Sequence, residues 1–291
     1  AAVGYLEGIY PSSTKRVGVQ AARALLARVY LYMGEYENVI KYCDEVLDDV
    51  RNLAVLDLNT VSVDDYHDIL KEEDCPEDIF TATSGLTLRG SSGYRFTVSD
   101  DLVECYQEEP GDWRWRGGNE DCHFFAYDLR SGIPIYSRIQ IDAATYLFVG
   151  YGLSFPEVYL NKAEAEAMLD KAGDAINTIN VIRTRRIENP TSIDGLSGED
   201  LVKYIRRERR RELSFLYHRW FDLRRYAVAP KYPEAMTVEH VWEAEESDLA
   251  NGTYVLNPYP EDGGWVLPFP SHVLEDNHGA LVDNVRPARN P

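Results

Sequence analysis

The chain lacks the long apolar runs, paired cysteines and catalytic signatures that would place it quickly in a class. Its weakly polar stretch 144–155 is too short and too interrupted by glycine to span a bilayer. Its four cysteines are Cys43, Cys75, Cys105 and Cys122. No two of them form a CxxC pair, so we expect buried free thiols, not a disulfide framework or a zinc site.

Basic charge is also in short supply. The 30 lysines and arginines are outnumbered by 49 acids, which gives a formal charge of -19. That excess argues against nucleic acid and other polyanions as partners, and leaves neutral or cationic ligands open.

One stretch, 206–225, departs from this acidic character, with the sequence RRERRRELSFLYHRWFDLRR. Its eight arginines are interrupted by three acids, which favours ion pairing over a nucleic-acid patch. An apolar stripe at helical spacing consists of Leu213, Leu216, Tyr217 and Trp220. We interpret the stretch as one ion-paired core helix.

Catalytic motifs are scarce as well. The sequence has no HExxH motif, and no serine or cysteine nucleophile with an orienting partner stands out. Acids gather near aromatic residues at Asp100, Asp101, Glu108, Glu109 and Asp112. Two carboxylates are what a glycoside hydrolase needs, but 49 acids make such proximity a matter of chance. Asp100 and Asp101 are more simply the first turn of a helix beginning after Ser99. We therefore expect no enzyme, no cofactor and no metal.

Helical periodicity predicts two helical hairpins. AARALLARVYLYMG forms a helix capped by Gly34, and YENVIKYCDEVLDDV returns from Tyr36. The small and aromatic residues of this first hairpin are placed much as in a tetratricopeptide repeat. The second hairpin is expected to begin with a capping box of Ser154 and Glu157, and Gly173 is expected to break it before DAINTINVIRTRR.

These elements give an all-α fold in a single domain, 1–291. We expect a helical hairpin at 18–50, an aromatic-rich insertion at 52–153, a helical repeat core at 154–228 and a C-terminal tail at 229–291. The insertion is too long for a connection without a role, so it is the expected functional region.

Most aromatic residues of the insertion are expected to pack it against the helices. Trp113 and Trp115 are the better surface candidates, because GDWRWRGG has polar or glycine neighbours on both sides. A glycan could stack on such rings.

Five segments, in order, resemble the SusD/RagB family of nutrient-binding outer-membrane lipoproteins of the Bacteroidetes. The segment ERRRELSFLYHRWFDLRRY resembles the signature of that family, and FPEVYLNKAEAEAML followed by AINTINVIRTRR is similar to its paired repeat helices. AARALLARVYLYMG looks like an earlier repeat helix, and VSDDLVECYQEEPGDWRW is similar to a capped helix followed by Asp-x-Arg, here Asp112 and Arg114. WVLPFPSHVLEDN resembles the closing motif, although VDNVRP replaces the usual ending.

The resemblance implies tetratricopeptide-like hairpins that carry a glycan-binding insertion and a wrapped tail. It implies a surface-exposed lipoprotein of the cell outer membrane that delivers a glycan to a TonB-dependent transporter of the SusC type. The chain starts at Ala1 without methionine, so we expect the signal peptide and lipid anchor, its one link to the membrane, to lie in a missing N-terminal part. The alternative is a tetratricopeptide-type interaction scaffold without its own ligand site.

By position, the family's ligand surface falls on a small set of residues. Aromatic platforms would be Tyr94, Trp113 and Trp115. Hydrogen bonds to sugar hydroxyls would come from Arg89, Arg95, Arg116 and Asn119.

Overall fold

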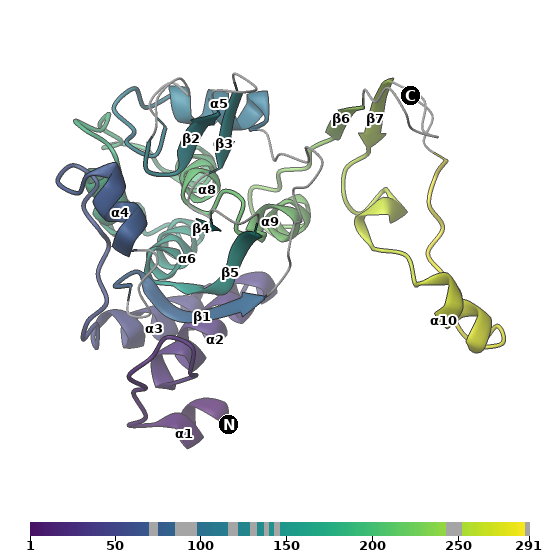
Figure 1. Cartoon of the computed structure of the whole chain (residues 1–291), viewed down its shortest axis with the longest axis horizontal. Coiled ribbons are helices and arrows are strands. Elements are labelled where there is room, and N and C mark those ends of the chain that lie inside the picture. Colours follow the sequence, from purple (N-terminus) through teal and green to yellow (C-terminus); the bar gives the residue numbers. More distant parts are fainter. Residues whose placement is uncertain are drawn as a thin grey trace. The chain divides into compact units, whose positions relative to one another are not determined.

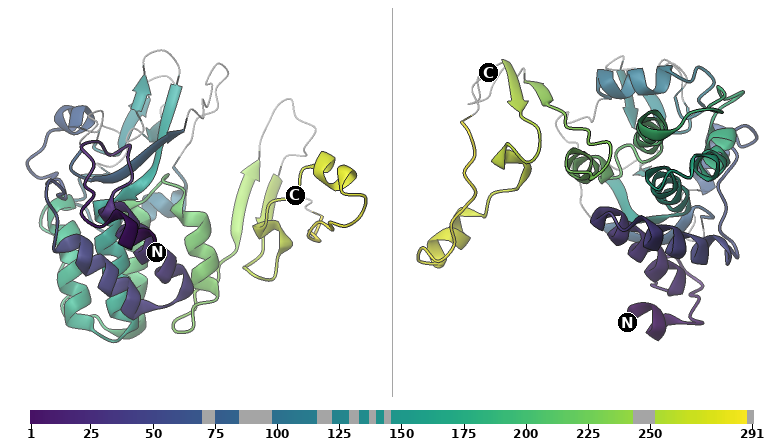
Figure 2. Two further views of the ribbon diagram at one scale, coloured as in Figure 1. Left: turned by 90° about the horizontal axis from the view of Figure 1, so that it is seen from below. Right: turned by 180° about the vertical axis from the view of Figure 1, so that it is seen from behind.

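The computed structural model is shown in Figures 1 and 2. It describes residues 1–69, 75–84, 98–115, 122–128, 133–136, 140–142, 146–242 and 252–288. The chain divides into two compact units, Ala1–Tyr217 and His218–Pro291, and each is described by itself. The expectation of one domain over 1–291 stays a prediction.

The first unit is mainly helical, which confirms the predicted fold class. Its helices are α1 (Ala2–Leu6), α2 (Val19–Met33), α3 (Tyr36–Leu47), α4 (Val63–Ile69), α5 (Asp100–Gln107), α6 (Phe155–Met168), α7 (Ala172–Arg186) and α8 (Gly198–Glu212). The α2–α3 and α6–α7 hairpins pack together through α3 and α6, and α8 packs on α6. Within the described part of the chain, no helix has both the length and the apolar character needed to cross a membrane.

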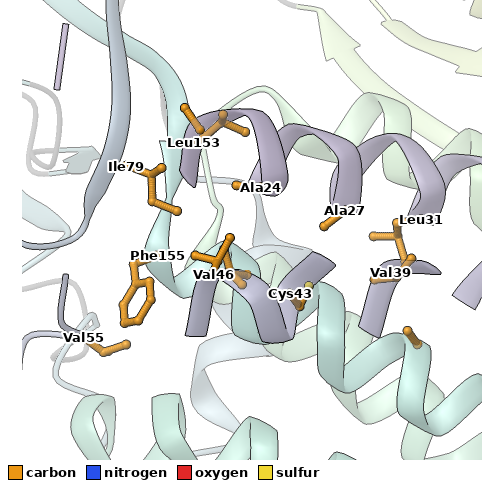
Figure 3. Packing of buried hydrophobic residues seen from close by; sticks show 13 residues of the cluster. Ala24, Ala27, Leu31, Val39, Cys43, Val46, Val55, Ile79, Leu153 and Phe155 are labelled. Carbon is orange, nitrogen blue, oxygen red and sulfur yellow. The ribbon is translucent and has the colours of Figure 1, made fainter. Parts of the chain in front are cut away.

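The first hairpin forms as predicted. Gly34 has φ 73°, a left-handed conformation that glycine adopts without strain, and its N–H reaches the carbonyls of Tyr30 and Leu31. Small side chains then let α2 approach α3 closely. Figure 3 shows this packing between Ala24, Ala27 and Leu31 of one helix and Val39, Cys43 and Val46 of the other. All four cysteines are buried free thiols, as predicted.

The second hairpin differs from prediction at both of its signals. Ser154 precedes α6, but its side chain makes no capping hydrogen bond. Glu157 is used elsewhere, because Arg28 Nε of α2 donates to its Oε1 at 2.6 Å. The helix break lies at 169–171, where Asp170 has φ 62°, and Gly173 is already inside α7. The capping box and the breaking glycine were therefore wrong.

The insertion contains short strands as well as helices. Its strands are β1 (Asp78–Ser84), β2 (Phe125–Asp128), β3 (Ile133–Tyr136), β4 (Gln140–Asp142) and β5 (Tyr146–Ser154). A three-stranded sheet has the order β1-β5-β4, and β2 pairs with β3; every pairing is antiparallel. Because β5 ends where α6 begins, the insertion is joined directly to the repeat core.

The arginine-rich stretch is two helices, not one. Helix α8 ends at Glu212, and α9 (His218–Ala227) follows a turn in which Phe215 has φ 59° and Tyr217 has φ 64°. The predicted apolar stripe is split by this turn, since Leu213 is buried while Trp220 is 37% exposed. The predicted ion pairing is confirmed. It includes Arg211 with Glu208, Arg225 with Asp222, and Arg206 with Glu164 of α6.

The second unit contains α9, a hairpin of β6 (Val238–Trp242) with β7 (Gly252–Leu256), a short 3-10 turn (Gly263–Trp265) and α10 (Ser271–Asp276). Trp265 and Tyr226 are each 1% exposed, and the Nε1 of Trp265 donates to Asn257 O at 2.7 Å. The Trp220 ring packs on it at 4.5 Å between centroids. The residues predicted as a tail therefore have packing of their own.

Candidate binding surface

The GDWRW segment lies against the C-terminal end of α7. Trp113 N donates to Arg186 O at 2.9 Å, and Glu188 N donates to Gly111 O at 2.8 Å. A Cβ at Gly111 would lie 2.2 Å from Glu188 O, so only glycine permits this approach. The backbone of this part of the insertion is thus held against the repeat core.

Asp112 and Arg114 form a bidentate ion pair inside the unit. Arg114 Nε donates to Asp112 Oδ1 at 2.8 Å and Nη2 to Oδ2 at 2.7 Å. The remaining nitrogen, Nη1, lies 2.8 Å from Glu208 Oε1 and 2.9 Å from Glu212 Oε2. These four side chains are at most 1% exposed. The Asp-x-Arg of the insertion is therefore a buried link to α8.

The link continues through two further arginines. Arg186 of α7 makes a bidentate pair with Glu212 at 2.9 and 3.0 Å and also reaches Glu77 at 2.6 Å. Arg211 of α8 pairs with Glu208 at 2.6 Å. We call the set of Glu77, Asp112, Arg114, Arg186, Glu208, Arg211 and Glu212 the ion-pair network. Buried charges are tolerated only when paired, so this network fixes the insertion on the helices.

The pKa values of two carboxyl groups in the network are shifted in opposite directions. Burial disfavours the charged form of Glu208, but attraction to Arg114 and Arg211 outweighs it and lowers its pKa to about 2. For Asp112, burial prevails over the attraction to Arg114, and its pKa is raised. The network therefore depends on Glu208 remaining ionised.

Trp115 is not on the surface, which corrects the expectation that its polar neighbours created. Its side chain is 6% exposed, and its ring stacks on Tyr106 at 5.8 Å between centroids. It belongs to an apolar cluster with Leu58, Tyr66 and Phe124 among others. The neighbouring charges that suggested exposure are those of Arg114 and Asp112, which are themselves buried in a pair.

Trp113 is partly exposed and is held on two sides. Its Nε1 donates to Asn59 Oδ1 at 2.9 Å, and its ring meets His123 edge-on at 6.3 Å between centroids. His123 is in turn placed by two carbonyl oxygens, Trp113 O at 3.0 Å from Nδ1 and Val61 O at 2.8 Å from Nε2. The result is a partly open indole in a fixed orientation. Sequence reasoning missed Asn59 and His123, because neither stands in a pattern that marks it.

The other predicted ligand contacts lie outside the described residues. They are Tyr94, Arg95, Arg116 and Asn119, together with Arg89. Of the predicted set, the structure thus places the two tryptophans, and it separates them into one partly open and one buried ring.

The acids near the aromatic residues have structural partners or positions. Ser99 Oγ accepts a hydrogen bond from Leu102 N at 3.4 Å, so Asp100 and Asp101 do occupy the first turn of α5. Glu109 accepts from Arg183 at 2.9 Å and from Tyr204 at 2.8 Å. Further bonds join Glu108 to Arg207 and Arg211. Asp112 belongs to the ion-pair network.

These features define a mainly helical protein in which the segment that carries Trp113 is fixed to the helices by buried ion pairs. Residues 155–286 match the model of the SusD family. Together with the fold described above, this match supports a place for the chain in the SusD/RagB family. No curated protein matches the chain.

Solved structures share the fold at low sequence identity. A SusD superfamily protein from Bacteroides vulgatus is 22% identical with a TM-score of 0.68, and the match covers 97% of this chain and 62% of that protein. A SusD-like carbohydrate binding protein from the same species is 22% identical with a TM-score of 0.62, and the match covers 88% of this chain and 54% of that protein. A SusD superfamily protein from Bacteroides thetaiotaomicron is 22% identical with a TM-score of 0.62, and the match covers 76% of this chain and 53% of that protein. This chain thus spans between half and two thirds of their length.

Proposed function

We propose that this protein binds glycans through the surface around Trp113. The observation that carries the proposal is the partly exposed indole held by Asn59 and His123, on an insertion locked to the core by the ion-pair network. The match to the SusD family model supports it, and one protein of the same fold is described as carbohydrate binding.

A fixed indole suits a sugar for physical reasons. The ring offers a large apolar face to the CH groups of a pyranose, and little rotamer entropy is lost because the side chain is already held. Tyr94, Arg95, Arg116 and Asn119 remain our proposed partners for the rest of the sugar, supplying a second ring and hydrogen bonds to hydroxyls. The role is binding without bond cleavage.

The cellular part of the proposal follows the family. The protein would be a surface-exposed lipoprotein of the outer membrane, and it would pass glycan to a TonB-dependent SusC-like transporter.

The test is glycan retention in affinity gel electrophoresis, run against a panel of polysaccharides. We expect Trp113→Ala to lower retention about tenfold, because loss of a stacking ring removes roughly 1–2 kcal/mol. Trp113→Phe should keep most of it. Tyr5→Ala is the matched control, since Tyr5 is an aromatic residue of α1 that is 84% exposed. Unchanged retention of Trp113→Ala, with a native circular dichroism spectrum, would contradict the assignment.

One observation favours a second candidate, the interaction scaffold. The outer face of α2 carries four large apolar side chains at helical spacing, Leu25, Val29, Tyr32 and Met33, which are 38–61% exposed. The arginines of α2 are already paired, Arg23 with Glu45 and Arg28 with Glu157. A helix that is apolar on all sides is normally covered.

The scaffold candidate is tested with the purified transporter in a surface-binding assay. We expect the double substitution Val29→Gln with Met33→Gln to weaken transporter binding and to leave glycan retention unchanged. If transporter binding is unaffected by this change, the α2 face has no part in it.

A further inference from the structure

A second candidate site lies at the start of the chain and shares no residue with the Trp113 surface. A cavity of about 150 Å³, partly open to solvent, is lined by the loop 9–18, the α3–α4 connection at 51–53 and the start of β1. Tyr10, Ser12, Thr14, Arg16, Asn52 and Asp78 are among its lining residues. This volume is below the roughly 300–1,000 Å³ of pockets for drug-sized ligands, so it suits about one sugar ring.

The walls of the cavity are held by the backbone. Val19 N donates to Ile9 O at 3.1 Å, which closes the loop at the first residue of α2. Thr81 N donates to Thr14 O at 2.9 Å, which ties the loop to β1. A Cβ at Gly18 would lie 2.4 Å from Pro11 Cδ and 2.8 Å from Ile9 O, so this residue must be small. The shape of the cavity is thus set by the backbone.

Asp49 organises one wall. Its carboxylate accepts the hydroxyl of Tyr10 and lies 3.2 Å from Arg51 Nε, and its carbonyl accepts the side chain of Gln20. The Arg51 guanidinium lies over the Tyr10 ring at 3.4 Å from the centroid. The charge of Arg51 is therefore already balanced.

Arg16 is different. It is exposed and lines the cavity, and among the described residues its guanidinium has no hydrogen-bond or ion-pair partner. Its backbone is fixed by a turn, in which Arg16 N donates to Ser13 O at 3.1 Å. Ser12 and Asn52 also line the cavity, and no partner of their side chains lies among the described residues. Within the described part of the chain, Arg16 is thus a lining cation without an ion-pair partner, and Ser12 and Asn52 add a hydroxyl and an amide to the lining.

Asp78 limits the kinds of ligand that can bind beside Arg16. Asp78 lines the same cavity, and its carboxylate accepts a hydrogen bond from Thr81 Oγ1 at 2.9 Å. A bare anion would be repelled by Asp78, whereas a ligand that also carries hydroxyl groups can donate to it. The combination favours a molecule with a carboxylate at one end and hydroxyls along its side.

We propose that this cavity binds one acidic sugar unit, a hexuronate. Its carboxylate pairs with Arg16, and its hydroxyls bond to Ser12, Asn52 and Asp78. The proposal does not depend on glycan binding at Trp113, because the two sites share no residue. In a chain of net charge -19, an uncompensated arginine in a cavity also gives an anionic sugar a place that the rest of the surface disfavours.

The experiment is a titration of the ¹⁵N-labelled chain with D-galacturonate, followed by amide chemical shifts in NMR. The comparison ligands are D-galactose, which lacks the carboxylate, and inorganic phosphate, which lacks the carbon-bound hydroxyls. We expect galacturonate to shift amides of 9–20 and 51–53 and to bind about tenfold more tightly than either comparison ligand. Arg16→Gln should weaken galacturonate binding about tenfold, and Lys15→Gln, an exposed neighbour, should leave it unchanged.

Several outcomes would overturn the proposal. Equal affinity for galactose would mean that the cation is not used, and equal affinity for phosphate would mean a simple anion site. Absence of shifts at 9–20 and 51–53, or no effect of Arg16→Gln, would remove the site altogether. Trp113→Ala serves to separate the two sites, since it should lower polysaccharide retention and leave galacturonate binding intact.

Discussion

The α2–α3 hairpin and the Asp112–Arg114 link are both interior, yet they are held by opposite means. The hairpin relies on small apolar side chains such as Ala24 and Ala27, which allow close helix packing. The insertion relies on paired charges that have no contact with water. The stability of the hairpin should change little when one methyl group is lost and should not depend on pH. The stability of the insertion should fall when either a partner or a charge of the ion-pair network is lost.

The largest expected effect comes from removing one partner of the ion-pair network. Arg114→Met leaves Asp112, Glu208 and Glu212 without one of their cations, and we expect a loss of about 3–5 kcal/mol in the free energy of unfolding. Urea denaturation followed by circular dichroism measures it. Arg207→Met is the control, because the Arg207–Glu108 pair is about 45% exposed and should contribute at most about 1 kcal/mol. Equal losses in the two variants would contradict a special role for burial.

The apolar hairpin should respond less, and in a different way. Leu31→Ala removes a side chain that is 2% exposed, and we expect a loss of about 3 kcal/mol from the lost transfer energy and the residual cavity. The difference between variant and parent should be the same at pH 7 and pH 4, since no charge is involved. A difference that changed with pH would mean that the hairpin and the network are coupled.

Acid should weaken the network first. Glu208 has a folded-state pKa of about 2 against an ordinary value of 4.5, so its stabilising contribution is full above pH 4.5 and is lost as the pH falls toward 2. The raised pKa of Asp112 works in the opposite sense and offsets part of this loss. The net effect should therefore be smaller than that of Arg114→Met.

A series of urea melts between pH 6 and pH 2.5 measures this dependence. Glu208→Gln should be less stable at pH 6 and should lose less stability on acidification than the parent. An identical pH dependence in both proteins would show that Glu208 does not control the response to acid.

The features that sequence predicted correctly are those with local causes. Gly34 ends α2 because its conformation favours glycine, and Ser99 caps α5 through a bond to a residue three positions on. The turn at 213–217 was missed because it places Phe215 and Tyr217, not glycine or proline, at positive φ. No local signal marks such a turn.

The candidate site was harder to predict for the same reason. Trp113 and Trp115 have equally polar neighbours in sequence, and what separates them is the pairing of Asp112 and Arg114 with acids of α8. A charged neighbour in the sequence suggests that a residue is exposed, but the suggestion fails when that charge is buried with a partner from another part of the chain. Of the two residues that fix Trp113, Asn59 is 54 positions away in the sequence, and His123, ten positions away, stands in no pattern that marks it.

The pair between Arg114 and Glu212 joins positions 98 residues apart, and this has a consequence for the order of folding. Asp112 lies beside Arg114 in the sequence, but Glu208 and Glu212 reach Arg114 only when the chain between them has folded back. Closing so long a loop costs conformational entropy before the contact compensates for it. We therefore expect the indole of Trp113, whose backbone lies on the end of α7, to reach its final orientation late in folding.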